Sequence, residues 1–164
     1  MAAKKAIILV EDNYEDPEFW YPYYRLQEEG FEVTIVAPEK NHTYVSKHGY
    51  PVTSEATPAD IKIEDYAVVV VPGGYAPDKL RRYEPILDLL RQADSKGLII
   101  ASICHAAWVS ISAGITKGKR MTCVAAIKDD LANSGAEYVD EPLFTDGNIV
   151  TSRFPADLPV FVKG

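Results

Sequence analysis

Apolar residues are concentrated in short runs along the first two thirds of the chain. Residues 6–10 (AIILV), 67–71 (AVVVV) and 98–103 (LIIASI) are almost entirely apolar, and residues 31–37 (FEVTIVA) are apolar and β-branched. Short apolar runs of this kind are typical of parallel strands that are buried on both faces. The pattern therefore predicts four strands of a largely parallel sheet.

Helical patterns separate these runs. Asp16 can cap a helix that has Pro17 at its first position, and Gly30 marks where this helix ends. A second helix is predicted before Gly97, with an apolar stripe at helical spacing that consists of Ile86, Leu89, Leu90 and Ala93. Strands that alternate with helices predict an α/β fold with helices on both faces of the sheet.

Shorter elements are predicted in the rest of the chain. Residues 38–51 are polar and are expected to form a loop. A helix follows residue 105 and ends before Gly114. Asp146-Gly147 predicts a tight hairpin into residues 148–152. The remaining predictions are strands at residues 121–126, 138–139 and 143–145, a short helix at 127–134, and the start of a helix at 155.

Composition and charge narrow the classes of function. The 164 residues are 47% hydrophobic and are expected to form a single domain over residues 1–164. A net charge of −7 disfavours nucleic acid and anionic membranes as partners. The apolar run before Glu11 is too short for a signal peptide or a membrane span, so we expect a cytoplasmic protein. Cys104 and Cys123 are accordingly expected to be reduced thiols.

Three predicted strand ends carry chemically useful residues, namely Glu15 and Glu18, Gly73 and Gly74, and Cys104 and His105. Ligands of open parallel sheets bind at the carboxyl ends of the strands. A cysteine at a sharp strand-to-helix turn is exposed, and the helix N-terminus favours its thiolate. Cys104 is therefore a candidate nucleophile.

Each of these residues also has a purely structural interpretation. A lone cysteine in an apolar run is usually a small core residue. Glu18 lies in the first turn of a predicted helix, where an acidic residue commonly offsets the helix dipole. His42 and His48 are six residues apart with no evident third ligand, so they make a poor metal site.

A resemblance to a known family covers nearly the whole chain. It is carried by YEDPEFWYPYYRLQEEGFEV, KHGYPV, VVVPGGYAPDKLR, ASICHAAWVSISAGITKGKRMT, IKDDLANSGAEYVD and DGNIVTSRFPADLP. In these stretches the sequence resembles the ThiJ/PfpI superfamily, most closely its intracellular protease I branch. The resemblance implies a flavodoxin-like three-layer sandwich of the class I glutamine amidotransferase type, no metal or organic cofactor, and a homo-oligomer, either dimer or hexamer.

The resemblance also implies roles for particular residues. Cys104 matches the nucleophile, His105 the histidine beside it, and Glu18 the acid that hydrogen-bonds the cysteine. Gly74 matches a backbone oxyanion donor, with the N–H of His105 as the second. Asp78 stands where protease-like members often have a glutamate that reaches the histidine of a neighbouring subunit.

Several positions depart from the pattern of the protease-like members. Asp78 is one methylene shorter than glutamate, the usual CHGP elbow is CHAA, and Val124 replaces a tyrosine near the pocket. Glu15, which also follows the first predicted strand, is a candidate for a secondary acid. These differences leave the nucleophile intact and make a peptidase less well supported.

Three functions are compatible with these residues. The first is a cofactor-independent enzyme of the glyoxalase III or deglycase type, in which the Cys104 thiolate attacks methylglyoxal-like aldehydes or glycated groups. In this mechanism burial raises the pKa of Glu18, which then passes protons. The second is an intracellular cysteine peptidase that acts on a peptide substrate. The third is a stress-response redox sensor or holdase chaperone in which Cys104 is oxidised.

Overall fold

The α/β class predicted from the sequence is confirmed by the structure, a computed structural model that describes residues 4–164. A six-stranded sheet has the order β2-β1-β5-β6-β10-β9, and its strands are parallel except for β9, which runs antiparallel to β10. The strands are β1 (Lys4–Leu9), β2 (Phe31–Val36), β5 (Tyr66–Val71), β6 (Ile99–Ile103), β9 (Phe144–Asp146) and β10 (Ile149–Ser152).

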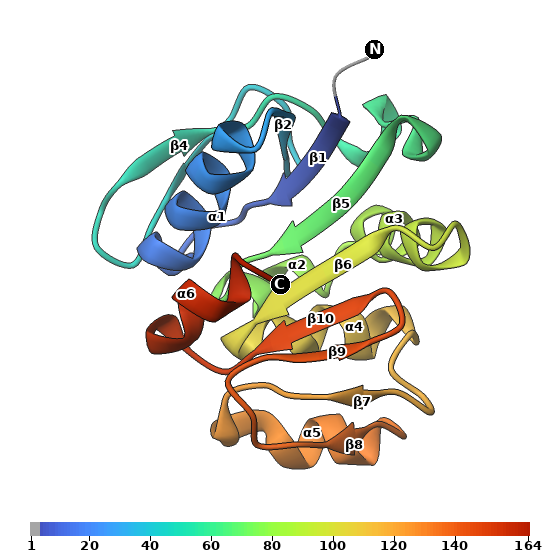
Figure 1. Cartoon of the computed structure of the whole chain (residues 1–164). Helices are drawn as coiled ribbons and strands as arrows, with labels where there is room; N and C mark the ends of the chain where they lie inside the picture. Colours follow the sequence, from blue (N-terminus) through green and yellow to red (C-terminus); the bar gives the residue numbers. More distant parts are fainter. Residues whose placement is uncertain (1–3) are drawn as a thin grey trace.

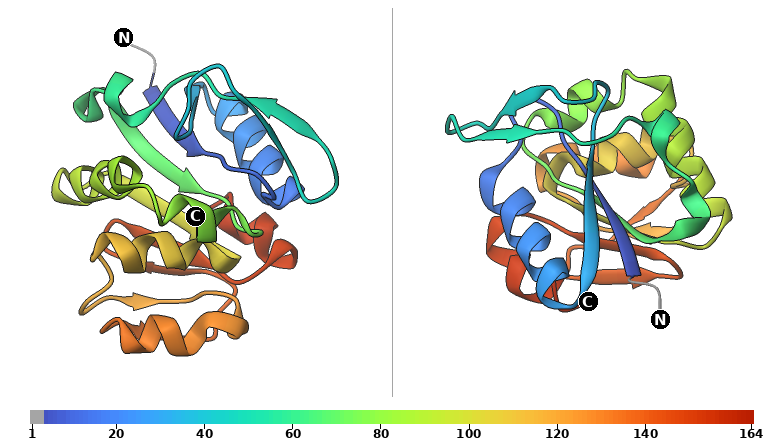
Figure 2. Two further views of the ribbon diagram at one scale, coloured as in Figure 1. Left: turned by 180° about the vertical axis from the view of Figure 1, so that it is seen from behind. Right: turned by 90° about the horizontal axis from the view of Figure 1, so that it is seen from above.

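Helices cover both faces of this sheet. Figure 1 shows α1 and α6 on one face, and the view from behind in Figure 2 shows α2, α3 and α4 on the other. The helices are α1 (Asp16–Glu28), α2 (Ala76–Leu80), α3 (Glu84–Ser95), α4 (Ala107–Ala113), α5 (Lys128–Asn133) and α6 (Leu158–Phe161). None of the helices in the described part of the chain is long and apolar enough to cross a membrane.

Alternate residues of the central strands supply two separate cores. Ile7 and Val69 pack in the cluster that contains the apolar faces of α3 and α4, whereas Ile8 and Val70 pack with Phe19 of α1. All of these side chains are almost fully buried, and each contributes about 1.5–3 kcal/mol through removal from water. Burial on both faces explains why these strands appear in the sequence as unbroken apolar runs.

Two sequence predictions are wrong in detail. The polar segment expected to be a loop contains an antiparallel hairpin of β3 (Thr43–Val45) and β4 (Pro51–Thr53). The strand expected over residues 121–126 is only β7 (Arg120–Met121), which pairs with β8 (Glu137–Tyr138). The predicted hairpin at Asp146-Gly147 is confirmed, with β9 and β10 on its two sides.

Candidate active site

Cys104 lies at the carboxyl end of β6 in a strained backbone conformation. Its φ angle is +62°, which residues other than glycine rarely adopt and which costs about 1–2 kcal/mol. A 3-10 turn over Cys104–Ala106 follows, and α4 begins directly after it. The sharp turn predicted after the strand is therefore present, and it places a half-buried thiol at the sheet edge.

Glu18 reaches the same edge from the first turn of α1. Its side chain is completely buried, and its Oε1 accepts a hydrogen bond from the Gly73 N–H at 3.0 Å. Among residues 4–164, its Oε2 has no hydrogen-bond partner that meets the usual geometric criteria. Burial, together with the charge of Glu15, raises the pKa of Glu18 to about 8, so the carboxyl group is largely protonated at pH 7. A residue that merely offset the helix dipole would lie in water as a carboxylate, and Glu18 does not.

The glycine pair after β5 allows the close approach of these groups. A Cβ atom on Gly73 would lie 2.8 Å from the Cys104 Cβ and 2.9 Å from the Ile103 carbonyl oxygen. Gly74 has a φ of +80°, and a Cβ there would lie 2.5 Å from the Glu15 nitrogen. Larger residues at these positions would therefore displace the elbow or the start of α1.

The backbone N–H groups of Gly74 and His105 favour the thiolate form of Cys104. Backbone donors beside a nucleophilic sulfur can also stabilise negative charge on the oxygen of a carbonyl that it attacks. The oxyanion role that the resemblance implies for these two groups stays a prediction.

The expectation that the elbow lowers the pKa of Cys104 is wrong for the free protein. Burial raises the pKa of the thiol to about 12, the negative charge of Glu18 adds to this, and the two N–H groups offset only part of it. The positive end of the helix does not compensate for the loss of water around the sulfur. At neutral pH, however, Glu18 is largely uncharged, so its charge does not raise the pKa of Cys104 under those conditions.

His105 lies beside the Cys104 sulfur and close to two aromatic rings. Its Nδ1 is 3.3 Å from the Cys104 sulfur, and its ring centroid is 5.0 Å from that of Trp108 and 6.4 Å from that of Tyr75. Burial, followed by the positive charge of Lys47, lowers the pKa of His105 below its usual value. The imidazole is therefore neutral at pH 7 and able to accept a proton.

Sequence reasoning missed three residues around the candidate site: Lys47, Tyr75 and Trp108. Trp108 is held by a 2.9 Å hydrogen bond from its Nε1 to Asp130. Lys47 is contributed by the polar segment between β3 and β4 and pairs with Glu15 at 2.9 Å. No local pattern in the sequence indicates that this segment folds back onto the ends of β1 and β5.

The other predicted residues lie in different surroundings. Glu15 is close to the site but is engaged by Lys47. The Asp78 carboxylate accepts a 2.6 Å hydrogen bond from Arg82 of its own chain, and its proposed contact with a neighbouring subunit stays a prediction. Val124 does lie beside the elbow, because its N–H donates to the Cys104 carbonyl at 3.3 Å.

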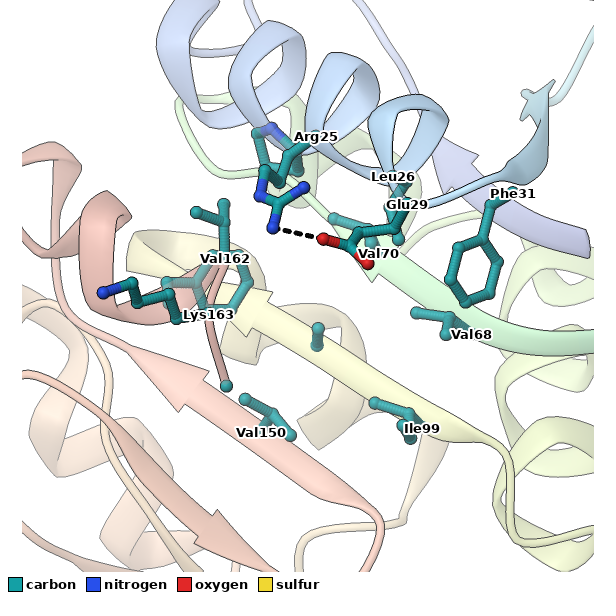
Figure 3. A pocket seen from close by; sticks show the side chains of 14 residues that line it. Arg25, Leu26, Glu29, Phe31, Val68, Val70, Ile99, Val150, Val162 and Lys163 are labelled. Carbon is teal, nitrogen blue, oxygen red and sulfur yellow. Dashed lines mark ion pairs between the residues drawn. The ribbon is translucent and has the colours of Figure 1, made fainter. Parts of the chain in front are cut away.

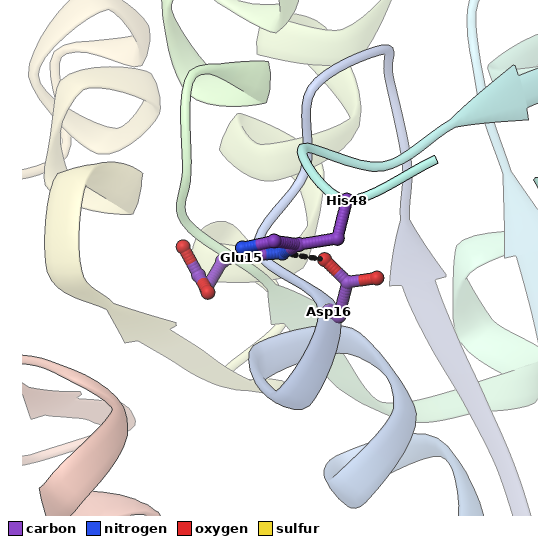
Figure 4. Close-up of side chains that lie close together, drawn as sticks. All are labelled: Glu15, Asp16 and His48. Carbon is purple, nitrogen blue, oxygen red and sulfur yellow. Dashed lines mark hydrogen bonds and ion pairs between the residues drawn. The ribbon is translucent and has the colours of Figure 1, made fainter. Parts of the chain in front are cut away.

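A cluster of three potential metal ligands, Glu15, Asp16 and His48, lies near the start of α1 (Figure 4). Their carboxylates already have partners in the chain. Asp16 accepts hydrogen bonds from Ser46 at 2.6 Å and pairs with His48 at 2.8 Å, while Glu15 pairs with Lys47. These contacts attach the segment between β3 and β4 to α1, and we assign no metal to them.

A cavity of about 380 Å³ lies between α1, α6 and the sheet, and its lining does not include Cys104, Glu18 or His105 (Figure 3). Its floor is apolar and includes Val70 and Ile99. Since Cys104 is absent from its lining, the cavity is not the candidate active site.

Comparison with known proteins identifies the family to which the chain belongs. Residues 4–164 match the model of the DJ-1/PfpI family. The chain is 42% identical to a deglycase of Pyrococcus horikoshii and 38% identical to the deglycase PfpI of Pyrococcus furiosus, in each case over 97% of this chain and 95% of the relative.

Solved structures give the same result. The DJ-1/ThiJ/PfpI-like part of a two-domain protein from Anabaena variabilis superposes with a TM-score of 0.96 at 38% identity, covering 98% of this chain and 46% of that one. DJ-1beta of Drosophila melanogaster gives a TM-score of 0.91 at 29% identity, covering 98% of this chain and 87% of that one. The chain belongs to the DJ-1/PfpI family.

Proposed function

We propose that this protein is a cofactor-independent cysteine enzyme that acts on reactive carbonyls, of the deglycase or glyoxalase III type. The observation that carries the proposal is the burial of Glu18 at the sheet edge that also holds the Cys104 thiol, which keeps the Glu18 carboxyl group largely protonated. Relatives that are 36–42% identical to the chain are named deglycases, which supports this class of reaction.

The reaction with methylglyoxal begins with addition of the Cys104 sulfur to the aldehyde carbon. The C–S bond forms, the thiol proton passes to the aldehyde oxygen, and a hemithioacetal results. The N–H groups of Gly74 and His105 stabilise the oxygen while it carries negative charge. Protonated Glu18 can donate a hydrogen bond to this oxygen, and neutral His105 is available as a base.

A proton then moves from the former aldehyde carbon to the neighbouring ketone carbon through an enediol. The first carbon is oxidised to a thioester, and the second is reduced to a secondary alcohol. Water hydrolyses the thioester, which releases lactate and restores the thiol. The overall change adds one water to methylglyoxal, and no external oxidant or reductant takes part.

One observation favours this function over a peptidase. Asp78 pairs with Arg82, so within the chain it does not orient His105 as a peptidase mechanism would need.

The test is lactate formation from methylglyoxal by the wild type, Cys104→Ser, Glu18→Gln and Cys123→Ser. We expect the wild type to form lactate, Cys104→Ser to lose at least about 10³-fold in rate, and Glu18→Gln to lose about 10²-fold. Cys123 is fully buried and serves as the matched control, with activity near that of the wild type. Full activity in Cys104→Ser, or cleavage of peptide amides without lactate formation, would contradict the proposal.

A further inference from the structure

Lys47 is held at the edge of the candidate site by an anchored segment. Its backbone N–H donates to the Tyr14 carbonyl at 3.0 Å. The residues on either side of it, Ser46 and His48, both bind the carboxylate of Asp16, at 2.6 and 2.8 Å. These contacts fix the direction in which the Lys47 side chain leaves the backbone.

The Lys47 side chain extends toward the nucleophile. Its Nζ donates to Glu15 Oε2 at 2.9 Å and lies 5.3 Å from the centre of the Tyr75 ring, which in turn neighbours His105. The charge of Lys47 lowers the pKa of His105, and the charge of a Cys104 thiolate raises the pKa of Lys47. The ammonium group therefore lies within electrostatic range of the sulfur.

The ammonium group has unused hydrogen-bonding capacity. A lysine has three N–H donors, and the contact with Glu15 occupies one of them. The side chain is 34% exposed, so a ligand can reach the others. Arg81, the cation that lies over Trp108, is engaged by Ser112 at 2.8 Å. Of these two cations, Lys47 is the one whose charge lowers the pKa of His105, and it is the better placed to meet a substrate bound at Cys104.

We propose that Lys47 determines substrate specificity by binding an anionic group, a carboxylate or a phosphate, carried close to the carbonyl carbon that Cys104 attacks. This inference rests on the proposed function and narrows it to reactive carbonyls with a negative charge. Small aldehydes without such a group bind by the same addition at Cys104 and lack the contact with the ammonium group. The selectivity resides in the charge of the Lys47 ammonium group, which keeps two N–H donors beyond its contact with Glu15.

Two nearly isosteric aldehydes, glyoxylate and glyoxylamide, test this inference through binding alone. Each adds reversibly to a thiol as a hemithioacetal, with the thiol proton moving to the aldehyde oxygen, and they differ in carrying a carboxylate or a neutral amide. The measurement is the concentration of each aldehyde that halves the rate of Cys104 alkylation by iodoacetamide. The ratio of the two concentrations within one variant cancels any change in thiol reactivity.

We expect the wild type to bind glyoxylate about tenfold more tightly than glyoxylamide, as a charge-assisted hydrogen bond provides. Lys47→Met should bring the ratio close to one, and Lys47→Arg should retain the preference. Lys96, which lies after α3, supplies the control, and Lys96→Met should match the wild type.

The outcomes separate this inference from the proposed reaction. An unchanged ratio in Lys47→Met, or equal weakening of both aldehydes, overturns the role of Lys47 even if methylglyoxal is converted to lactate. Failure of both aldehydes to protect wild-type Cys104 overturns it as well. A glyoxylate preference that disappears in Lys47→Met supports it, and absence of lactate formation would then contradict the proposed reaction alone.

Discussion

At the scale of single residues, the ionisation of Cys104 depends on Glu18. Both are buried at the same sheet edge, and the negative charge of Glu18 raises the pKa of the Cys104 thiol. With a pKa of about 8 for Glu18, the protonated acid needed in the proposed reaction is lost as the pH rises through that value. We therefore expect kcat/KM to fall on the alkaline side as Glu18 loses this proton, and a pH–rate profile measures the fall.

Alkylation of the thiols tests this coupling. Cys104 should react with iodoacetamide before the fully buried Cys123, yet more slowly at pH 7 than free cysteine, because burial raises its pKa. At pH 9, where Glu18 is ionised, Glu18→Gln should react faster than the wild type because a nearby negative charge has been removed. Mass spectrometry of the labelled peptides measures both rates. Slower labelling in Glu18→Gln at pH 9, or preferential labelling of Cys123, would contradict the coupling.

The sequence predicted the residues at the centre of the site better than it predicted their environment. The positions after strand ends single out Cys104 and His105, whereas the role of Glu18 depends on the family resemblance, and the structure brings all three to one sheet edge. The environment depends on burial by distant segments, which no local turn signal encodes, so the expected direction of the Cys104 pKa shift was wrong. Lys47 was missed for the same reason, since its position depends on how the segment between β3 and β4 folds back.

At the scale of elements, the site depends on how closely three strand ends approach one another. Tyr14 and Gly74 form an isolated antiparallel bridge, which joins the segment after β1 to the turn after β5. The Glu15 N–H donates to the Gly73 carbonyl at 3.2 Å, so the start of α1 is attached to the same turn. The glycine turn therefore positions the acid as well as the oxyanion donor.

Alanine substitutions at two glycines separate backbone strain from steric exclusion. Gly74 and Gly97 have similar φ angles of +80° and +73°, but in the described part of the chain only Gly74 of the two has neighbours within 4 Å of an added Cβ. Gly97→Ala should cost about 1 kcal/mol in unfolding free energy, and Gly74→Ala should cost about 1–3 kcal/mol more. Urea unfolding measures both, and equal losses would show that the turn can relax away from Asn13 and Glu15.

The elements most easily predicted were those with strong hydrophobic patterns. β1, β5 and β6 are buried on both faces, so their sequences are almost uniformly apolar. The hairpin of β3 and β4 has three-residue strands in which only the central residue is buried, and so short a pattern cannot be distinguished from a loop. The hairpin is held by contacts with residues that are distant in the sequence, and no local pattern predicts such contacts.

At the scale of the whole molecule, assembly into a homo-oligomer stays a prediction. Tyr75 is 58% exposed next to α2, and Asp78 of that helix is exposed as well. Exposed tyrosine is favoured in protein interfaces. Asp78 would have to exchange its contact with Arg82 for one with a neighbouring subunit, which weakens the gain from assembly.

Light scattering coupled to size exclusion tests this prediction on the wild type and Asp78→Ala. We expect an oligomer in the wild type, with activity that falls when Asp78→Ala reduces assembly. Arg82→Ala is the matched control, because it frees Asp78 without removing its carboxylate. A fully active wild-type monomer would show that Asp78 is a surface residue whose partner is Arg82.

The burial of Cys104 makes the reactivity of its thiol depend on whether the chain is folded. A nascent or unfolded chain exposes this thiol to water, where its pKa returns to about 8.5 and its thiolate fraction at neutral pH exceeds that of the folded protein. Glu18 and the glycine turn lie 86 and about 30 residues upstream in sequence, so the shielding exists only after β6 has joined the sheet. Folding therefore protects the nucleophile from cellular oxidants, and oxidative damage should mark chains that have not matured or that have opened.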